Sequence, residues 1–239
     1  MTTVLFVRHG LTAMTGPVLA GWTPGLHLDE RGRAQAEAVA SRLAPVPLAA
    51  IVSSPLERCQ ETAEALAAGR EVVVDPDVRL AECRYGDWTG QEIKRLAKDP
   101  LWRVVQAHPS AAVFPGEQGE PLRTTQARGV DAVRDWNARL GPDATYAVCS
   151  HGDVIKAIVA DALGLHLDMF QRISVDPCSL TVIRYTELRP FLLRLNDTGG
   201  GVEDLRPPKR KGRRSRRVSS DAVVGGGAGG GAGGSAGAS

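Results

Sequence analysis

The chain has 239 residues, of which 43% are hydrophobic, and its formal net charge at pH 7 is +2. This length and apolar content predict one or two folded domains and exclude a chain that is disordered throughout. No apolar run is long enough for a membrane-spanning helix, and residues 1–10 lack the basic start and long apolar core of a secretory signal. We therefore expect a cytoplasmic protein that does not bind membranes.

The end of the chain differs in composition from the rest. Residues 206–239 hold eight of the 29 Lys and Arg residues but one of the 27 acidic residues, so residues 1–205 carry a net charge of −5. Behind the basic run at 206–217, residues 225–239 contain only Gly, Ala and Ser. Such a composition cannot bury a core. We predict a folded domain over residues 1–200 and a disordered tail over residues 201–239.

Short apolar runs alternate with helical patterns along residues 1–200. The expected strands are residues 4–7, 48–52, 72–74 and 145–149, followed by a closing pair at 179–185 and 190–196. The expected helices are one capped by Asp29 and reaching Leu43, one from Pro55 to about Ala67, one at 89–107 with a break near Pro100, one at 122–140 and one that includes 154–162. This alternation predicts an α/β fold in which helices flank both faces of a largely parallel central sheet.

A His-Gly step follows two of the expected strands. Arg8, His9 and Gly10 come after the first strand, Arg58 comes shortly after the second, and His151 comes after the strand at 145–149. The carboxyl ends of parallel strands meet at one edge of a sheet, where ligands bind. We therefore expect both histidines and both arginines to lie together.

These residue types suit phosphoryl chemistry. The guanidinium groups of Arg8 and Arg58 match phosphate oxygens, and their charge lowers the pKa of a nearby imidazole, which keeps His9 neutral and nucleophilic. Glu82, which follows the third expected strand, is the candidate donor of a proton to the leaving oxygen and then the candidate base for water. We expect Tyr85 and Trp88 to raise the pKa of Glu82 by excluding water.

Five segments resemble, in the same order, the signature segments of the histidine phosphatase superfamily, which includes the cofactor-dependent phosphoglycerate mutases. They are VRHG at 7–10, LDERGRAQA at 28–36, SSPLERCQETA at 53–63, LAECRYGDWTG at 80–90 and CSHG at 149–152. The resemblance implies a phosphoglycerate mutase-like fold and catalysis by His9, Glu82 and His151, with His9 phosphorylated. It further implies that Arg8, Arg58 and His151 bind the phosphoryl group, with no metal and no organic cofactor.

The chain departs from the family pattern at three places. Thr15 stands where many members have an asparagine that touches phosphate, so we expect its hydroxyl group to make that contact. Cys83, rather than an arginine, directly follows the acid, and Arg84 comes one place later, which favours a phosphatase over a mutase. The segment FPGEQGEPL at 114–122 resembles a family stretch that often shapes the substrate entrance, but it carries two extra residues.

Three functions remain open. The favoured one is a hydrolase that removes phosphate from a small phosphorylated metabolite through a phosphohistidine at His9. The second is a phosphomutase that returns the phosphoryl group to another hydroxyl group. The third is a catalytically silent binding module whose basic tail makes weak, salt-sensitive contacts with nucleic acid or another acidic surface.

The sequence disfavours two other kinds of catalysis. Two histidines without a cluster of acids make a poor metal site, which disfavours a metal-dependent hydrolase. Ser53 and Ser54 precede Pro55 and are expected to cap a helix, because no Gly-x-Ser-x-Gly segment marks a serine nucleophile.

The four cysteines are far apart in the sequence and are expected to be reduced thiols.

Overall fold

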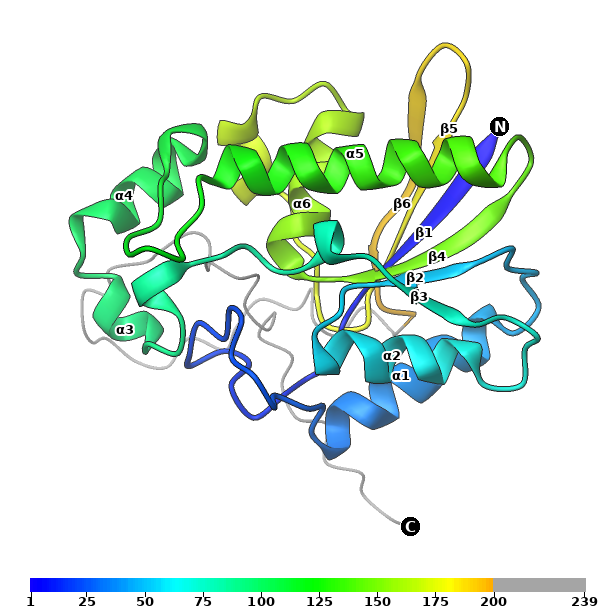
Figure 1. Cartoon of the computed structure of the whole chain (residues 1–239), viewed down its shortest axis with the longest axis horizontal. Coiled ribbons are helices and arrows are strands. Elements are labelled where there is room, and N and C mark those ends of the chain that lie inside the picture. Colours follow the sequence, from blue (N-terminus) through cyan, green and yellow to red (C-terminus); the bar gives the residue numbers. More distant parts are fainter. Residues whose placement is uncertain (200–239) are drawn as a thin grey trace, which may run out of the picture.

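The computed structural model describes residues 1–199 of the chain (Figure 1). The tail predicted at 201–239 lies outside the described residues, and the domain boundary near residue 200 stays a prediction. Within residues 1–199, no helix is both long enough and apolar enough to cross a membrane. All four cysteines are buried and form no disulfide.

A six-stranded sheet with the order β3-β2-β4-β1-β5-β6 forms the centre of the fold. Its strands are β1 (Thr2–Arg8), β2 (Ile51–Ser53), β3 (Val74–Pro76), β4 (Thr145–Ser150), β5 (Leu180–Tyr185) and β6 (Pro190–Asp197). The pairs β2–β3, β2–β4 and β1–β4 are parallel, whereas β5 is antiparallel to both β1 and β6. The largely parallel sheet and its closing hairpin are as predicted.

Helices cover both faces of the sheet (Figure 1). The helices are α1 (Glu30–Leu43) and α2 (Glu57–Ala67) on one face, α5 (Leu122–Leu140) and α6 (Gly152–Ala162) on the other, and α3 (Ile93–Leu96) and α4 (Pro100–Ala107) beside them. Short 3₁₀ helices occur at Val78–Leu80, Gly86–Trp88, Pro109–Ala111 and Leu167–Arg172. This arrangement confirms the predicted α/β class.

The apolar run in β1 is continuous because both sides of the strand are buried. Val4 and Phe6 belong to the core under α5 and α6, whereas Leu5 and Val7 belong to the core under α1 and α2. Successive side chains of a strand point to opposite faces, so a strand between two helical layers needs apolar residues at every position.

Local signals in the sequence set several helix boundaries. The carboxylate of Asp29 accepts a hydrogen bond of 2.8 Å from the backbone N–H of Gly32 and caps α1 as expected. The helical pattern at 89–107 forms two helices, because Asp99 caps α4 and Pro100 begins it. The third strand lies two residues later than expected, at Val74–Pro76.

The register of the parallel strands places three chain segments at one edge of the sheet. Arg8, the last residue of β1, lies opposite Ser150, the last residue of β4. Ser53, the last residue of β2, lies opposite Cys149. The residues that follow these strand ends therefore emerge side by side.

Candidate active site

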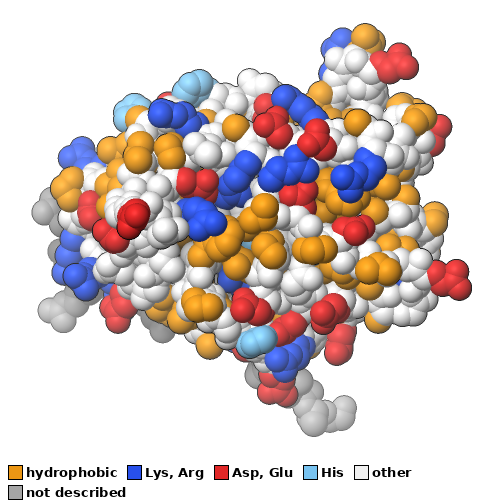
Figure 2. All heavy atoms as spheres, viewed as in Figure 1, with side chains coloured by type: hydrophobic (Ala, Val, Ile, Leu, Met, Phe, Trp, Pro, Cys, Tyr) orange, Lys and Arg blue, Asp and Glu red, His pale blue; other side chains and the backbone are white. Residues whose placement is uncertain are grey.

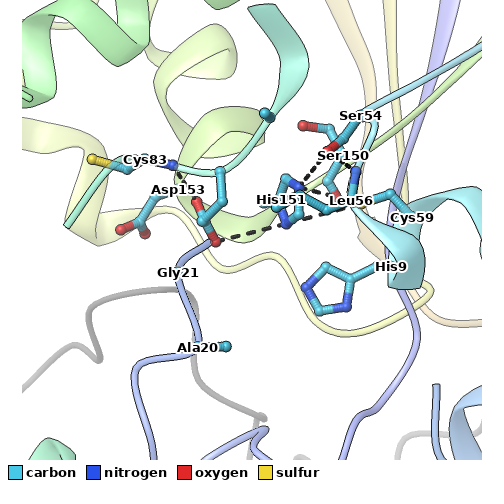
Figure 3. A network of polar contacts seen from close by, with 12 residues as sticks. His9, Ala20, Gly21, Ser54, Leu56, Cys59, Cys83, Ser150, His151 and Asp153 are labelled. Atoms are coloured by element: carbon cyan, nitrogen blue, oxygen red, sulfur yellow. Dashed lines mark hydrogen bonds and ion pairs between the residues drawn. The ribbon is translucent and has the colours of Figure 1, made fainter. Parts of the chain in front are cut away.

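Two buried histidines meet at this edge of the sheet. The rings of His9 and His151 lie 5.2 Å apart between centroids at an angle of 61°, and the two residues are 5% and 0% exposed. Figure 3 shows them facing the same space, with Ser54 beside His151 and with Asp153 and Cys83 on the opposite side. The structure thus brings together the two His-Gly steps.

The ring of His9 is held in a single tautomer. Its Nδ1 lies 2.8 Å from the carbonyl oxygen of Gly10, and a carbonyl only accepts, so Nδ1 carries the proton and Nε2 carries the lone pair. Burial, followed by the charges of Arg58 and Arg8, holds the pKa of His9 well below its usual range. The ring is therefore neutral, with its lone pair on Nε2.

Gly10 is needed for close packing behind His9. A Cβ atom at this position would lie 2.5 Å from the carbonyl oxygen of Gly32 in the first turn of α1. No side chain fits at that distance. The glycine of the first His-Gly step therefore lets the loop after β1 approach α1.

Arg58 contacts both histidines from the first turn of α2 and is 1% exposed. Its Nε donates a hydrogen bond of 3.3 Å to Nε2 of His9. Its Nη2 lies 3.2 Å from Nδ1 of His151 and also donates a hydrogen bond of 2.8 Å to the carbonyl oxygen of Gly21. Within residues 1–199, its buried Nη1 has no hydrogen-bond partner. A buried donor without a partner is costly, so this atom is suited to an anionic ligand.

Arg8 enters the same region from the end of β1. It is 2% exposed, and its Nη1 donates a hydrogen bond of 2.8 Å to the carbonyl oxygen of Val175. Burial is the main cause that lowers the pKa of Arg8, whereas Glu82 is the largest of the charges that raise it. The charge of Arg8 is one of those that lower the pKa of His9.

His151 directly precedes α6, and its ring is hydrogen-bonded to Arg58 and Ser54, with Sγ of Cys59 3.3 Å from Nε2. Because Nη2 of Arg58 only donates, Nδ1 of His151 accepts, and Nε2 then donates to Oγ of Ser54 over 2.8 Å. Oε2 of Glu82 lies 3.8 Å from Nδ1. Burial and then the charge of Arg58 lower the pKa of His151 well below its usual range.

Ser54 is part of the candidate site, although the sequence suggested only a cap. The expected helix start at Pro55 is wrong, because α2 begins at Glu57 and its N-cap residue, Leu56, has no side-chain capping bond. Oγ of Ser54 accepts from the backbone N–H of Leu56 at 3.3 Å and from Nε2 of His151 at 2.8 Å. The signal that could have found it is its place directly after β2, the neighbour of the strand that carries His151.

Glu82 lies on a firmly held segment and is 3% exposed. Oε1 accepts a hydrogen bond of 2.9 Å from the backbone N–H of Cys83. Two residues earlier, the carbonyl of Leu80 accepts a bond of 2.7 Å from Oγ of Ser150, which ties the segment to the end of β4. The carboxyl group therefore has a fixed position beside His151.

The environment of Glu82 favours its protonated form. Burial is the main cause that raises the pKa of the carboxyl to about 7, and the charge of Asp153 raises it further, against the opposing charge of Arg58. Tyr85 and Trp88, which we expected to exclude water, are buried, and Tyr85 also donates to Asp153 over 2.8 Å. The contribution of Asp153 was not anticipated, although this residue follows the second His-Gly step.

Thr15 is not joined to this cluster by a hydrogen bond in the described part of the chain. Its Oγ1 accepts from the backbone N–H of Thr12 at 2.9 Å and lies 2.9 Å from the hydroxyl of the same residue. These bonds close the loop after β1. The expected contact between Thr15 and phosphate stays a prediction.

Residues 1–199 contain no group of three or more His, Cys, Asp or Glu side chains arranged to hold a metal ion. The expectation that the protein uses no metal and no cofactor stays a prediction. The clustered groups are instead neutral imidazoles, guanidinium groups and a carboxyl group with a raised pKa.

The fold and the site define an α/β protein with a buried cluster of histidines and arginines at the carboxyl edge of a largely parallel sheet. The family model of the histidine phosphatase superfamily, branch 1, matches residues 4–198, and the chain therefore belongs to this superfamily.

Two curated relatives span most of the chain. Phosphoserine phosphatase 1 of Hydrogenobacter thermophilus is 31% identical over 209 residues, which cover 83% of this chain and 93% of the relative. A protein named probable phosphoglycerate mutase GpmB, from Cronobacter sakazakii, is 28% identical over 215 residues, which cover 87% of this chain and 97% of the relative.

Solved structures show the same fold. Bacillus stearothermophilus YhfR superimposes with a TM-score of 0.74 at 28% identity, over 82% of this chain and 98% of that chain. A mycobacterial glucosyl-3-phosphoglycerate phosphatase in complex with VO₃ gives a TM-score of 0.72 at 28% identity, over 82% and 98% of the two chains. These findings confirm the predicted superfamily and an enzyme of the phosphatase or phosphomutase type.

Proposed function

We propose that the protein hydrolyses the phosphomonoester of a small metabolite through a phosphohistidine at His9. In the first step, Nε2 of His9 attacks phosphorus, the bond between phosphorus and the leaving oxygen breaks, and Glu82 gives its proton to that oxygen. In the second step, water attacks the phosphohistidine, Glu82 takes a proton from the water, and the bond between nitrogen and phosphorus breaks. The products are an alcohol and inorganic phosphate.

The other side chains of the cluster bind the phosphoryl group in this proposal. Arg8, Arg58 and His151 hold its non-bridging oxygens, which gain negative charge as the transition state forms. The partnerless Nη1 of Arg58 is the donor best suited to this role within residues 1–199. Thr15 adds one hydroxyl contact if its loop opens on binding.

One observation carries the proposal: Nε of Arg58 lies 3.3 Å from Nε2 of His9, whose other ring nitrogen is bonded to the carbonyl of Gly10. The ring therefore presents an unprotonated nitrogen directly beside a cation that binds phosphate. A nucleophile and the charge that attracts its electrophile are adjacent, as covalent phosphoryl transfer requires.

The direct test is to trap the intermediate. Enzyme mixed briefly with p-nitrophenyl phosphate is quenched with denaturant in mild base, in which phosphohistidine survives, and the phosphorylated residue is located by mass spectrometry under the same basic conditions. We expect phosphate on His9, and we expect His9→Ala to lose both the label and turnover. His108→Ala removes a histidine whose side chain is 73% exposed and serves as the matched control. Turnover by His9→Ala at the wild-type rate would overturn the mechanism.

A phosphomutase is the second candidate, because the relative named as a phosphoglycerate mutase aligns over 97% of its length. A mutase uses the same phosphohistidine but returns the phosphoryl group to a second hydroxyl group. Adding 3-phosphoglycerate would then suppress the release of inorganic phosphate and produce a phosphorylated isomer. We expect phosphate release to continue, measured with labelled substrate.

Binding through the basic tail is a separate proposal. On the face seen in Figure 2, Lys and Arg side chains of the described residues are interspersed with Asp and Glu, which disfavours nucleic-acid binding there. The residues that would bind, 206–217, lie outside the described residues. If deletion of 206–239 leaves retention on a low-salt nucleic-acid column unchanged, tail binding is wrong.

The cytoplasmic location stays a prediction.

A further inference from the structure

An arginine lies beside the segment that carries Glu82. Cζ of Arg84 lies 3.9 Å from the centroid of the Trp22 ring, which is a cation–π contact. The indole Nε1 of Trp22 in turn donates a hydrogen bond of 2.6 Å to the backbone carbonyl of Glu82. One tryptophan therefore supports both the guanidinium group and the backbone of the candidate proton donor.

The backbone of Arg84 is also fixed. Its N–H donates to Oε1 of Glu120 over 2.9 Å, and its carbonyl accepts from the backbone N–H of Glu120 at 2.9 Å. Glu120 is anchored by an ion pair of 2.7 Å with Arg128 on α5. The position of the Arg84 guanidinium group is thus set at both ends of its side chain.

The charge of Arg84 is not matched by an acid within residues 1–199. No carboxylate oxygen there lies within 4.0 Å of its nitrogens, and its one side-chain hydrogen bond is an exposed contact of 3.4 Å with the neutral amide of Gln118. Arg79 and Arg128, by contrast, both form ion pairs with carboxylates. A guanidinium group stacked on an indole keeps its edge donors for a ligand.

We propose that Arg84, held on Trp22, binds a carboxylate of the leaving group, so that the enzyme prefers phosphomonoesters of hydroxy acids to those of alcohols without a carboxylate. The inference rests on the proposed function, in which Glu82 protonates the leaving oxygen. The remainder of the leaving group then continues past Glu82, and Arg84 is two residues further along the same segment. A carboxylate and a guanidinium group form two parallel hydrogen bonds, which makes the contact selective.

The test compares O-phosphoserine with phosphoethanolamine, which differ only by the carboxylate. We expect the wild-type enzyme to prefer phosphoserine in kcat/KM. Arg84→Met keeps an unbranched apolar stem over Trp22 and removes the charge, and we expect it to reduce the preference by about 10- to 100-fold, chiefly through KM. Arg84→Lys is expected to retain part of the preference, and Arg84→Glu to favour phosphoethanolamine.

Arg139→Met is the matched control. Arg139 stacks on Trp136 at 4.4 Å near the end of α5, so the same contact is lost outside the candidate site, and we expect the substrate preference to stay at the wild-type value. A wild-type enzyme without the preference, or Arg84→Met with the full preference, would overturn the inference. The phosphoenzyme assay with p-nitrophenyl phosphate is run on the same samples. Label on His9 without a carboxylate preference means that the inference alone is wrong, whereas an absent label overturns the proposed function and the inference with it.

Discussion

The hydroxyl group of Tyr85 donates a hydrogen bond of 2.8 Å to Asp153, which lies in the buried first turn of α6. This bond fixes a carboxylate whose charge is, after burial, the largest cause of the raised pKa of Glu82. Arg58 and Arg8 act in the opposite direction, and Nδ1 of His151 lies 3.8 Å from the Glu82 carboxylate. The protonation of Glu82 near pH 7 is therefore a balance among buried charges.

Asp153→Asn is predicted to shift this balance. Removing the negative charge lowers the pKa of Glu82, so Glu82 loses its proton at a lower pH. The basic limb of the pH profile of kcat/KM is therefore expected to move to lower pH by about one unit. The measurement is a pH profile with an alkyl phosphate, whose leaving oxygen needs a proton.

A double variant controls for the buried lysine next to Asp153. Nζ of Lys156 lies 3.4 Å from Asp153, and a lone buried ammonium group would destabilise the single variant. Asp153→Asn combined with Lys156→Met removes both charges and is expected to show a basic limb shifted in the same direction. A basic limb at the wild-type pH in both variants would contradict the role of Asp153.

Ser54→Ala removes the 2.8 Å hydrogen bond of His151 Nε2 and leaves Sγ of Cys59, at 3.3 Å, beside this nitrogen. We predict a decrease in kcat/KM of about 10-fold, because the ring loses one orienting hydrogen bond. Steady-state kinetics with p-nitrophenyl phosphate measure it. Ser41→Ala is the control, since its hydroxyl group is exposed and donates within α1 to the carbonyl of Glu37. Equal rates for the two variants would show that the hydroxyl group of Ser54 does not orient His151.

Glu82→Gln is predicted to remove activity and to stabilise the fold at high pH. The pKa of Glu82 is about 7 in the folded state and 4.5 ordinarily, so folding favours the protonated group. Its contribution to the free energy of unfolding is complete below pH 4.5 and is lost as the pH rises through 7. The variant should therefore gain about 2–3 kcal/mol in the free energy of unfolding, relative to wild type, between pH 5 and pH 8. Urea unfolding at both pH values checks this, with the exposed Glu64→Gln expected to show no such gain.

Arg128→Met is predicted to destabilise the segment before Glu82. Arg128 donates to the carbonyl groups of Arg79 and Ala81 over 2.7 Å each and to that of Glu82 over 3.0 Å. Its loss removes these three bonds and leaves the partly buried carboxylate of Glu120 without its ion-pair partner. We expect a loss of about 3 kcal/mol in urea unfolding. Arg134→Met, on the same helix with 65% of its side chain exposed, should change stability by less than about 0.5 kcal/mol. Similar losses in the two variants would contradict the bracing role.

Much of the fold follows from local signals in the sequence. The bounds of α5 coincide with the expected residues 122–140, because Pro121 precedes the helix and Gly141 ends it. The third strand was misplaced by two residues, since it is a three-residue strand at the edge of the sheet with mostly exposed side chains. A strand of that kind has no alternation of apolar and polar residues to read.

The candidate site was predictable where it depends on strand ends and less so where it depends on side-chain direction. His9, Arg58 and His151 follow parallel strands, whose order alone brings them together. The bond between Tyr85 and Asp153 joins residues 68 positions apart and has no local signal. The hydroxyl group of Thr15 lies 2.9 Å from that of Thr12, a contact that depends on loop geometry and could not be read from the sequence, and its expected contact with phosphate stays a prediction.

The place of β4 between β1 and β2 has a consequence for folding. The ends of β1 and β2 become neighbours of the same strand only when residues 145–150 insert between them, and contacts of such long sequence separation form slowly. A chain halted before residue 145 would hold His9 and both arginines without the strand that joins β1 to β2. The return of enzymatic activity during refolding would therefore report the insertion of β4 between β1 and β2.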